Sequence, residues 1–131
     1  MKLIFSKILI LFLFVLICNY SYAIEKMYYC IEKETIAFDP KENFKAKKYE
    51  PFRFKAKIDI NNNAFSSDDI RMTTTSCERM IVTWKHLMQC KTSFGGFFVL
   101  NTKNLKFSYT HMIGMHGDDP VVLAHGRCEE F

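Results

Sequence analysis

Polar and apolar side chains alternate most regularly over residues 52–60, where every even-numbered position is apolar and every odd-numbered position is polar. This period of two predicts a β-strand with one buried face and one face in water. Three asparagines follow at 61–63, and asparagine tolerates the left-handed backbone of a tight turn. We therefore predict a hairpin whose second, weaker strand covers residues 64–72.

The second half of the chain shows the same kind of pattern. Leu105, Phe107 and Tyr109 alternate with polar residues, which predicts a strand over 105–110. Residues 101–104 separate this strand from an apolar run at 97–100, and Gly95-Gly96 separate that run from a strand around 87–90. These turns predict three consecutive antiparallel strands.

Strands are also expected at both ends of the globular part. Residues 27–38 form the first strand before Asp39-Pro40 interrupts it, and Asp118-Asp119-Pro120 opens a last strand over 121–128. About eight short strands result, at the spacing typical of all-β domains. The predicted fold is a small all-β barrel or two-sheet sandwich built as an antiparallel meander.

Residues 76–91 fit two interpretations. Thr75 and Glu78 have the spacing of a capping box, and five apolar residues have helical spacing: Cys77, Met80, Ile81, Trp84 and Met88. We favour strands, because residues 81–84 are rich in β-branched and aromatic side chains and the neighbouring segments form a meander. A helix remains the alternative.

The N-terminal segment has the pattern of a secretory signal peptide. Lys2 and Lys7 precede an apolar run at 8–18, and Ser21 and Ala23 are small residues suited to signal peptidase. The run of 11 residues is shorter than the roughly 20 needed to span a bilayer. We expect cleavage after Ala23, which leaves one domain at 24–131 and no membrane span; lipidation of Cys18 is the alternative.

Composition narrows the class of protein further. Of 131 residues, 49% are hydrophobic and 24% are charged, which fits one globular domain. The net charge of +4 includes the two signal-peptide lysines, so 16 basic residues face 14 acidic ones in the mature chain. This small excess argues against a nucleic-acid binder. Frequent Lys, Asn, Ile and Phe point to a bacterial periplasmic or extracellular protein, which we expect to be a monomer.

Four cysteines remain after cleavage, an even number in an oxidising compartment. They predict two disulfides with three possible connectivities. We favour Cys30 with Cys128, which ties the first strand to the last, and Cys77 with Cys90, which closes a local unit. A zinc site is the alternative, but no cysteine pair has the spacing of a zinc knuckle.

The mature chain opens with Tyr28-Tyr29-Cys30 and ends with Gly-Arg-Cys-Glu-Glu-Phe at 126–131, framing the meander. In this outline it resembles small secreted β-barrel proteins of bacteria, among them barrels similar to the C-type lysozyme inhibitors. The resemblance implies a disulfide-bonded barrel. In those inhibitors a loop bearing Ser and Gly beside Tyr enters the cleft of the enzyme, and we place no such loop in this sequence.

Imidazole and thioether groups are concentrated near the predicted last hairpin. Both are ligands for copper, and Cu(I) prefers the softer sulfur. If the strand at 105–112 pairs with the strand at 121–128, two of the histidines approach each other across the hairpin. The candidate copper ligands are His111, Met112, Met115, His116 and His125.

Two further groups are candidates for partner binding. Basic side chains that include Lys47, Arg53, Lys55 and Lys57 gather in one region and suit an anionic partner. Trp84 and Phe94 are the aromatic residues least easily assigned to the core, and exposed together they would mark a contact surface.

No catalytic motif is present: the sequence lacks a nucleophile elbow, a phosphate-binding glycine-rich loop and a His-Glu-x-x-His pattern. We therefore expect a non-enzymatic binding protein without a cofactor, whose partner is another protein or a small apolar ligand. Copper binding through the His and Met residues is the second hypothesis. A hydrolase without a recognisable motif is the third.

Overall fold

The computed structural model describes residues 26–80, 83–112 and 120–131. Over these ranges the chain is all-β, as predicted, and no described helix is long and apolar enough to span a membrane. Nine strands and two short 3-10 helices follow in order: β1 (Lys26–Asp39), η1 (Pro40–Glu42), β2 (Lys45–Tyr49), β3 (Arg53–Asp59), β4 (Ala64–Ser67), η2 (Ile70–Met72), β5 (Thr74–Arg79), β6 (Leu87–Thr92), β7 (Phe97–Asn101), β8 (Lys106–His111) and β9 (Val121–Glu130).

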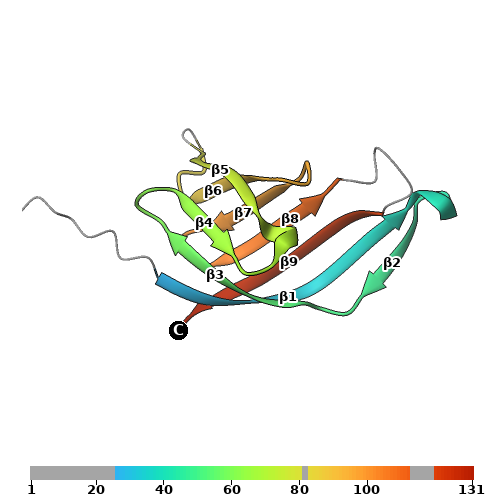
Figure 1. Ribbon diagram of the computed structural model, residues 1–131, viewed down its shortest axis with the longest axis horizontal. Helices are drawn as coiled ribbons and strands as arrows, with labels where there is room; N and C mark the ends of the chain where they lie inside the picture. Colours follow the sequence, from blue (N-terminus) through green and yellow to red (C-terminus); the bar gives the residue numbers. More distant parts are fainter. Residues whose placement is uncertain (1–25, 81–82, 113–119) are drawn as a thin grey trace, which may run out of the picture.

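All strand pairs are antiparallel, and the strands form one sheet that curls into a nearly closed barrel (Figure 1). The order across the sheet is β4-β3-β1-β9-β8-β7-β6-β5, and β2 is an additional partner of β1. The two outermost strands of this order, β4 and β5, meet where the Thr74 hydroxyl donates to the Phe65 carbonyl over 2.6 Å. Of the two architectures expected from the sequence, the barrel is the one observed.

Strand β1 is 14 residues long and serves two parts of the molecule. Its first half pairs with β3, and its second half pairs with β2 on the same edge. A bulge between Glu32 and Glu34 changes which positions face inward, from the even-numbered residues to Thr35 and Ala37. The second half of β1, β2 and the start of β9 extend beyond the barrel body (Figure 1); we call them the arm.

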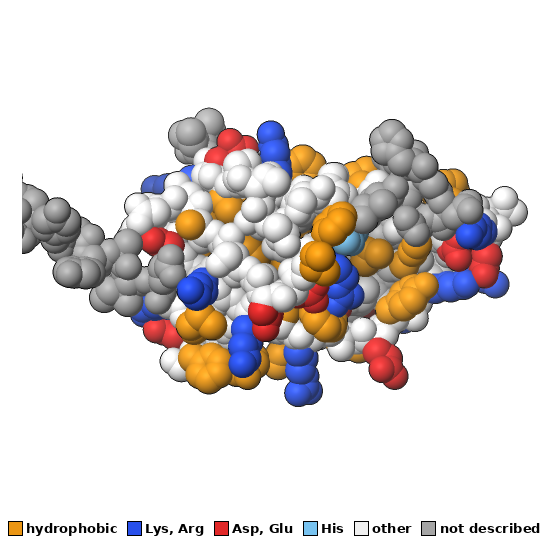
Figure 2. Space-filling model, viewed as in Figure 1, with side chains coloured by type: hydrophobic (Ala, Val, Ile, Leu, Met, Phe, Trp, Pro, Cys, Tyr) orange, Lys and Arg blue, Asp and Glu red, His pale blue; other side chains and the backbone are white. Residues whose placement is uncertain are grey.

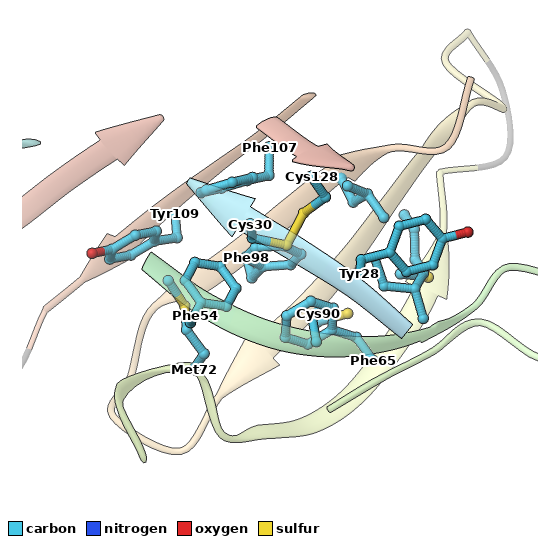
Figure 3. Close-up of a cluster of buried hydrophobic side chains, with 14 of the residues drawn as sticks. Tyr28, Cys30, Phe54, Phe65, Met72, Cys90, Phe98, Phe107, Tyr109 and Cys128 are labelled. Carbon is cyan, nitrogen blue, oxygen red and sulfur yellow. A yellow bond between two sulfur atoms is a disulfide. The ribbon is translucent and has the colours of Figure 1, made fainter. Parts of the chain in front are cut away.

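Aromatic and aliphatic side chains fill the body of the barrel (Figure 3). Phe98 lies at the centre, with its ring centroid 4.1 Å from that of Phe65 and 5.5 Å from that of Phe107. Met72 of η2 packs into the same cluster and is 1% exposed. Because large rings occupy the interior, the body itself serves as a core rather than as a ligand chamber.

Both disulfides have the expected pairing. Cys30 of β1 bonds to Cys128 of β9, and Cys77 of β5 bonds to Cys90 of β6. In each pair the two cysteines lie directly opposite one another in the strand register. The first bridge therefore joins the first and last strands, which the barrel brings side by side.

Three local predictions require correction. The strand predicted over 64–72 ends at Ser67, because the Asp69 side chain accepts a hydrogen bond from the backbone of Arg71 and begins η2. Leu105 precedes its strand rather than beginning it, since its backbone is left-handed with φ of 58°. The sequence also indicated no strand at β2, whose side chains are mostly exposed.

Within the described residues, the ambiguous segment at 76–91 contains the strands β5 and β6 and not the alternative helix. Residues 83–86 connect the two strands, so the described part of the 81–84 run that favoured a strand does not lie in one. β5 and β6 pair from Thr74 to Thr92, with Met80 N–H donating to the Leu87 carbonyl near the connecting loop. Residues 81–82 lie outside the described part of the chain.

Candidate functional site

A pocket of about 530 Å³ lies on the inner side of the arm, next to the filled barrel body. Ala37 of β1 and Val122 of β9 supply part of its apolar lining. Pro51 and Phe52, in the segment between β2 and β3, supply another part. On one edge of β1, the pairing with β3 stops at Ile31 and the pairing with β2 begins at Thr35. The residues that connect β2 to β3 line the pocket beside this interruption. We call it the arm pocket.

A buried carboxylate stands at the boundary between the arm pocket and the core. Glu32 is 2% exposed and accepts three hydrogen bonds. Its donors are the Tyr109 hydroxyl at 2.6 Å, the Phe52 backbone N–H at 3.0 Å and the Thr35 hydroxyl. The carboxylate therefore joins β1 to β8 and to the start of β3, and its hydrogen bonds offset the cost of burying it.

Tyr109 reaches Glu32 from the edge of the core, where its hydroxyl points away from the other labelled core side chains (Figure 3). Burial raises the pKa of Tyr109, and the hydrogen bond to Glu32 raises it further. The phenol consequently stays protonated and acts as a donor across the whole physiological pH range.

Arg71 brings a positive charge to the wall of the arm pocket. Its guanidinium lies 3.9 Å from the centroid of the Phe52 ring and pairs with the Asp69 carboxylate at 2.9 Å. Burial acts to raise the pKa of Asp69, but the hydrogen bonds from Arg71 outweigh burial and lower it. The stacking and the ion pair together hold the guanidinium in place beside the pocket.

His111 lies at the same end of the barrel. Its ring packs edge-on against Phe94 with centroids 5.1 Å apart, and its Nε2 is buried without a hydrogen-bond partner among the described residues. Burial lowers the pKa of His111, and the charge of Arg71 lowers it further, against an opposing effect of Asp69. The balance of these effects favours the neutral form of the imidazole.

The proposed approach of His111 to His125 is wrong. His111 lies two residues after the inward-facing Tyr109 on the same strand, so it faces inward as well. His125 lies between the buried residues Ala124 and Gly126, so it faces outward. His125 Nε2 instead lies 3.6 Å from a Glu34 carboxylate oxygen. A one-residue difference in register places the two imidazoles on opposite faces of the sheet.

The rest of the candidate copper site is less fully described. Met112 is exposed at the end of β8, and Met115 and His116 lie outside the described residues. Within the described ranges, no three His, Cys, Asp or Glu side chains converge in a way that could hold a metal ion.

The basic candidates also separate onto two faces. Lys47 is paired opposite the inward-facing Ala37, and its ammonium lies 2.5 Å from Glu42. Arg53, Lys55 and Lys57 alternate with the buried residues of β3 and face outward. The four cations therefore do not form one patch.

The two aromatic candidates are far apart as well. Trp84 precedes β6 and is 60% exposed, while Phe94 follows β6 and is half-buried against His111. A six-residue strand separates them by about 20 Å. They do not form a single contact surface.

The residues that define the arm pocket were missed in the sequence because they come from separate elements. Tyr109 and Glu32 are 77 positions apart. One signal was present. Tyr28, Cys30 and Glu32 are alternate residues of the predicted first strand and so share one face, which places an acidic residue on the buried face.

No known family, curated protein or solved structure matches this chain.

Proposed function

We propose that this protein is a secreted or periplasmic, non-enzymatic binding protein that holds a small, largely apolar ligand in the arm pocket. The observation that carries the proposal is the contrast between the filled barrel body and the adjoining pocket of about 530 Å³. Pockets of roughly 300 to 1,000 Å³ are typical of small-molecule sites.

The cysteines and the N-terminal sequence support the proposed compartment. Two disulfides fit an oxidising environment outside the cytoplasm. We take residues 1–23 as the signal peptide that exports the chain, with cleavage after Ala23.

The lining of the arm pocket suggests the chemistry of the ligand. Ala37, Val122 and Pro51 offer apolar contacts, whereas the Arg71 guanidinium, which is paired with Asp69, offers hydrogen-bond donors at one wall. Glu32 already accepts three hydrogen bonds and acts as a structural group. The best fit is an apolar molecule with a hydrogen-bond-accepting group near Arg71, because Asp69 already balances the charge of Arg71 and the carboxylates of Glu32 and Glu50 also line the pocket.

A fluorescent probe with this chemistry tests the proposal. 1-Anilinonaphthalene-8-sulfonate combines two apolar ring systems with a sulfonate, and its emission rises in apolar surroundings. We expect it to bind the folded protein with one-to-one stoichiometry. Val122→Trp should weaken this binding at least about tenfold, because an indole would occupy the pocket.

Leu123→Trp is the matched control, because Leu123 is the next residue of β9 and faces the outer side of the sheet. It should leave the affinity unchanged. Equal affinity of the wild type and Val122→Trp, with both variants folded by near-ultraviolet circular dichroism, would rule out the arm pocket as the binding site.

A further inference from the structure

The outer face of the barrel around the first half of β1 is unusually basic. Ile31 lies between Arg53 and Arg127 in the strand register, and Arg127 is itself opposite Lys106 of β8. All of these outward side chains are exposed. We call this surface the basic face; its cations are Arg53, Lys55, Lys106 and Arg127.

Few acidic groups balance these charges. Among the described residues, Glu129 is opposite Tyr29 on β9, and Asp68 borders Lys55 and Lys57. Four cations against two carboxylates leave +2 on one side of a mature chain whose total is 16 minus 14, or +2. The rest of the mature surface is therefore close to neutral, and the positive potential is concentrated here.

Exposed apolar side chains lie among these cations. Met27, Tyr29 and Ile31 are the outward residues of β1 and are 38%, 41% and 39% exposed. Phe131, at the end of β9, is 73% exposed and stacks on Tyr29 with ring centroids 4.4 Å apart. The Lys55 ammonium lies 5.6 Å from the Tyr29 ring centroid. Figure 2 shows hydrophobic side chains beside Lys and Arg side chains along its lower edge.

We propose that the basic face, with its exposed apolar side chains, docks the protein on the surface of a lipid bilayer that contains anionic lipids. Cations near such a surface are attracted to the anionic headgroups. Aromatic and aliphatic side chains beside them enter the boundary between headgroups and acyl chains. A soluble polyanion would satisfy the cations but would leave Met27, Ile31 and Phe131 in water.

The first test is co-sedimentation of the protein, exported to and purified from a bacterial periplasm, with lipid vesicles. We expect at least about tenfold stronger partitioning to vesicles with about 30% phosphatidylglycerol than to pure phosphatidylcholine vesicles. Raising the salt from about 0.1 M to about 0.5 M should reduce this partitioning, because screening shortens the reach of the charges.

Charge reversal shows whether the basic face is responsible. Arg53→Glu/Lys55→Glu should lower partitioning to the anionic vesicles at least about tenfold. The control Lys91→Glu/Lys103→Glu makes the same change in net charge at exposed positions on β6 and in the β7–β8 turn, away from β1. It should retain most of the binding. Equal losses in the two variants would overturn the proposal.

A fluorescence measurement tests the orientation on the membrane. In a Trp84→Phe/Phe131→Trp variant, brominated phosphatidylglycerol should quench and blue-shift the emission. In the wild type it should leave Trp84 unaffected, because β6, which begins three residues after Trp84, is across the barrel from β1 (Figure 1). Quenching of Trp84 but not of residue 131 would contradict the proposal. Binding to soluble polyglutamate without binding to vesicles would assign the face to an acidic polypeptide instead.

Discussion

Glu32 is the residue on which the junction between core and arm depends. Its carboxylate is buried and connects residues that are distant in sequence, Tyr109 and Phe52, through hydrogen bonds. Buried donors that lose their acceptor cost more than the hydrogen bond contributed, because the donor is left without water. The position is therefore far more sensitive to substitution than an exposed glutamate.

We expect Glu32→Leu to lower the free energy of unfolding by about 2–4 kcal/mol, since the Tyr109 hydroxyl and the Phe52 N–H lose their acceptor. Glu129→Leu, at an exposed position of β9, should change it by less than about 0.5 kcal/mol. Urea unfolding measures both. Adding Tyr109→Phe to Glu32→Leu should recover part of the lost stability. If Glu32→Leu left the free energy of unfolding unchanged, the carboxylate would not stabilise the junction between core and arm.

The lowered pKa of Asp59 predicts that the stability of the fold depends on pH. Hydrogen bonds from the Asn62 side chain and from the backbone N–H groups of Asn62 and Asn61 lower the pKa of Asp59 in the folded state. Its stabilising effect is therefore complete above the unfolded pKa and is lost as pH falls through the lower folded pKa. Asp59→Asn should be less stable than the wild type near pH 7.

The difference between the wild type and Asp59→Asn should shrink as pH falls below the unfolded pKa of Asp59 and through its lower folded pKa. Urea unfolding at several pH values measures it. A difference that stays constant from neutral to acidic pH would show that the charge of Asp59 contributes nothing.

At the scale of elements, one arginine closes the seam between the two ends of the sheet. Arg79 of β5 donates to Asn63 Oδ1 and to the Ile60 carbonyl in the β3–β4 hairpin. It also donates to the Thr102 hydroxyl in the β7–β8 turn at 3.0 Å. The seam has few backbone hydrogen bonds of its own, so these contacts hold β4 near β5.

Arg79→Lys should destabilise the protein by about 2 kcal/mol, because a single ammonium cannot reach all three acceptors. Amide hydrogen exchange should speed up mainly in β4 and β5, on either side of the seam. Arg127→Lys, on the exposed outer face of β9, is the control and should leave exchange unchanged. Unaltered exchange in β4 and β5 would show that the seam closes without Arg79.

The two disulfides should differ in their contribution. Cys30–Cys128 closes a loop with a sequence separation of 98, against 13 for Cys77–Cys90. The loop-entropy relation predicts about 4.7 kcal/mol for the longer loop and about 3 kcal/mol for the shorter. Cys30→Ala/Cys128→Ala should therefore have the lower urea midpoint of the two double variants. The opposite order would show that the loops are already restricted in the unfolded chain.

Strands were predicted correctly where one face of the strand is buried and the other is exposed. β3 was found because Phe54, Ala56 and Ile58 are buried and the residues between them are exposed. β2 was missed because four of its five side chains are exposed and the fifth is half-buried, so no alternation marks it. The bulge in β1 was invisible for a related reason: a one-residue shift in pairing leaves no local pattern in the sequence.

At the scale of the whole molecule, function depends on what the barrel brings together. The sequence predicted an all-β barrel or sandwich and both disulfides, because these follow from periodicity and from the number and positions of the cysteines. It did not predict the arm pocket, since Glu32, Arg71 and Val122 meet only after the sheet curls. The sequence also gave no sign that Arg127 and Lys106 join the cations of β3 on one face, because only the strand register brings them together.

The most direct test of ligand binding in the arm pocket is native mass spectrometry of the protein exported to a bacterial periplasm. We expect the mass of residues 24–131 less four hydrogens, plus an adduct of a small molecule that is absent from Val122→Trp. A wild-type chain without any adduct, or an adduct that Val122→Trp retains, would contradict ligand binding in the arm pocket.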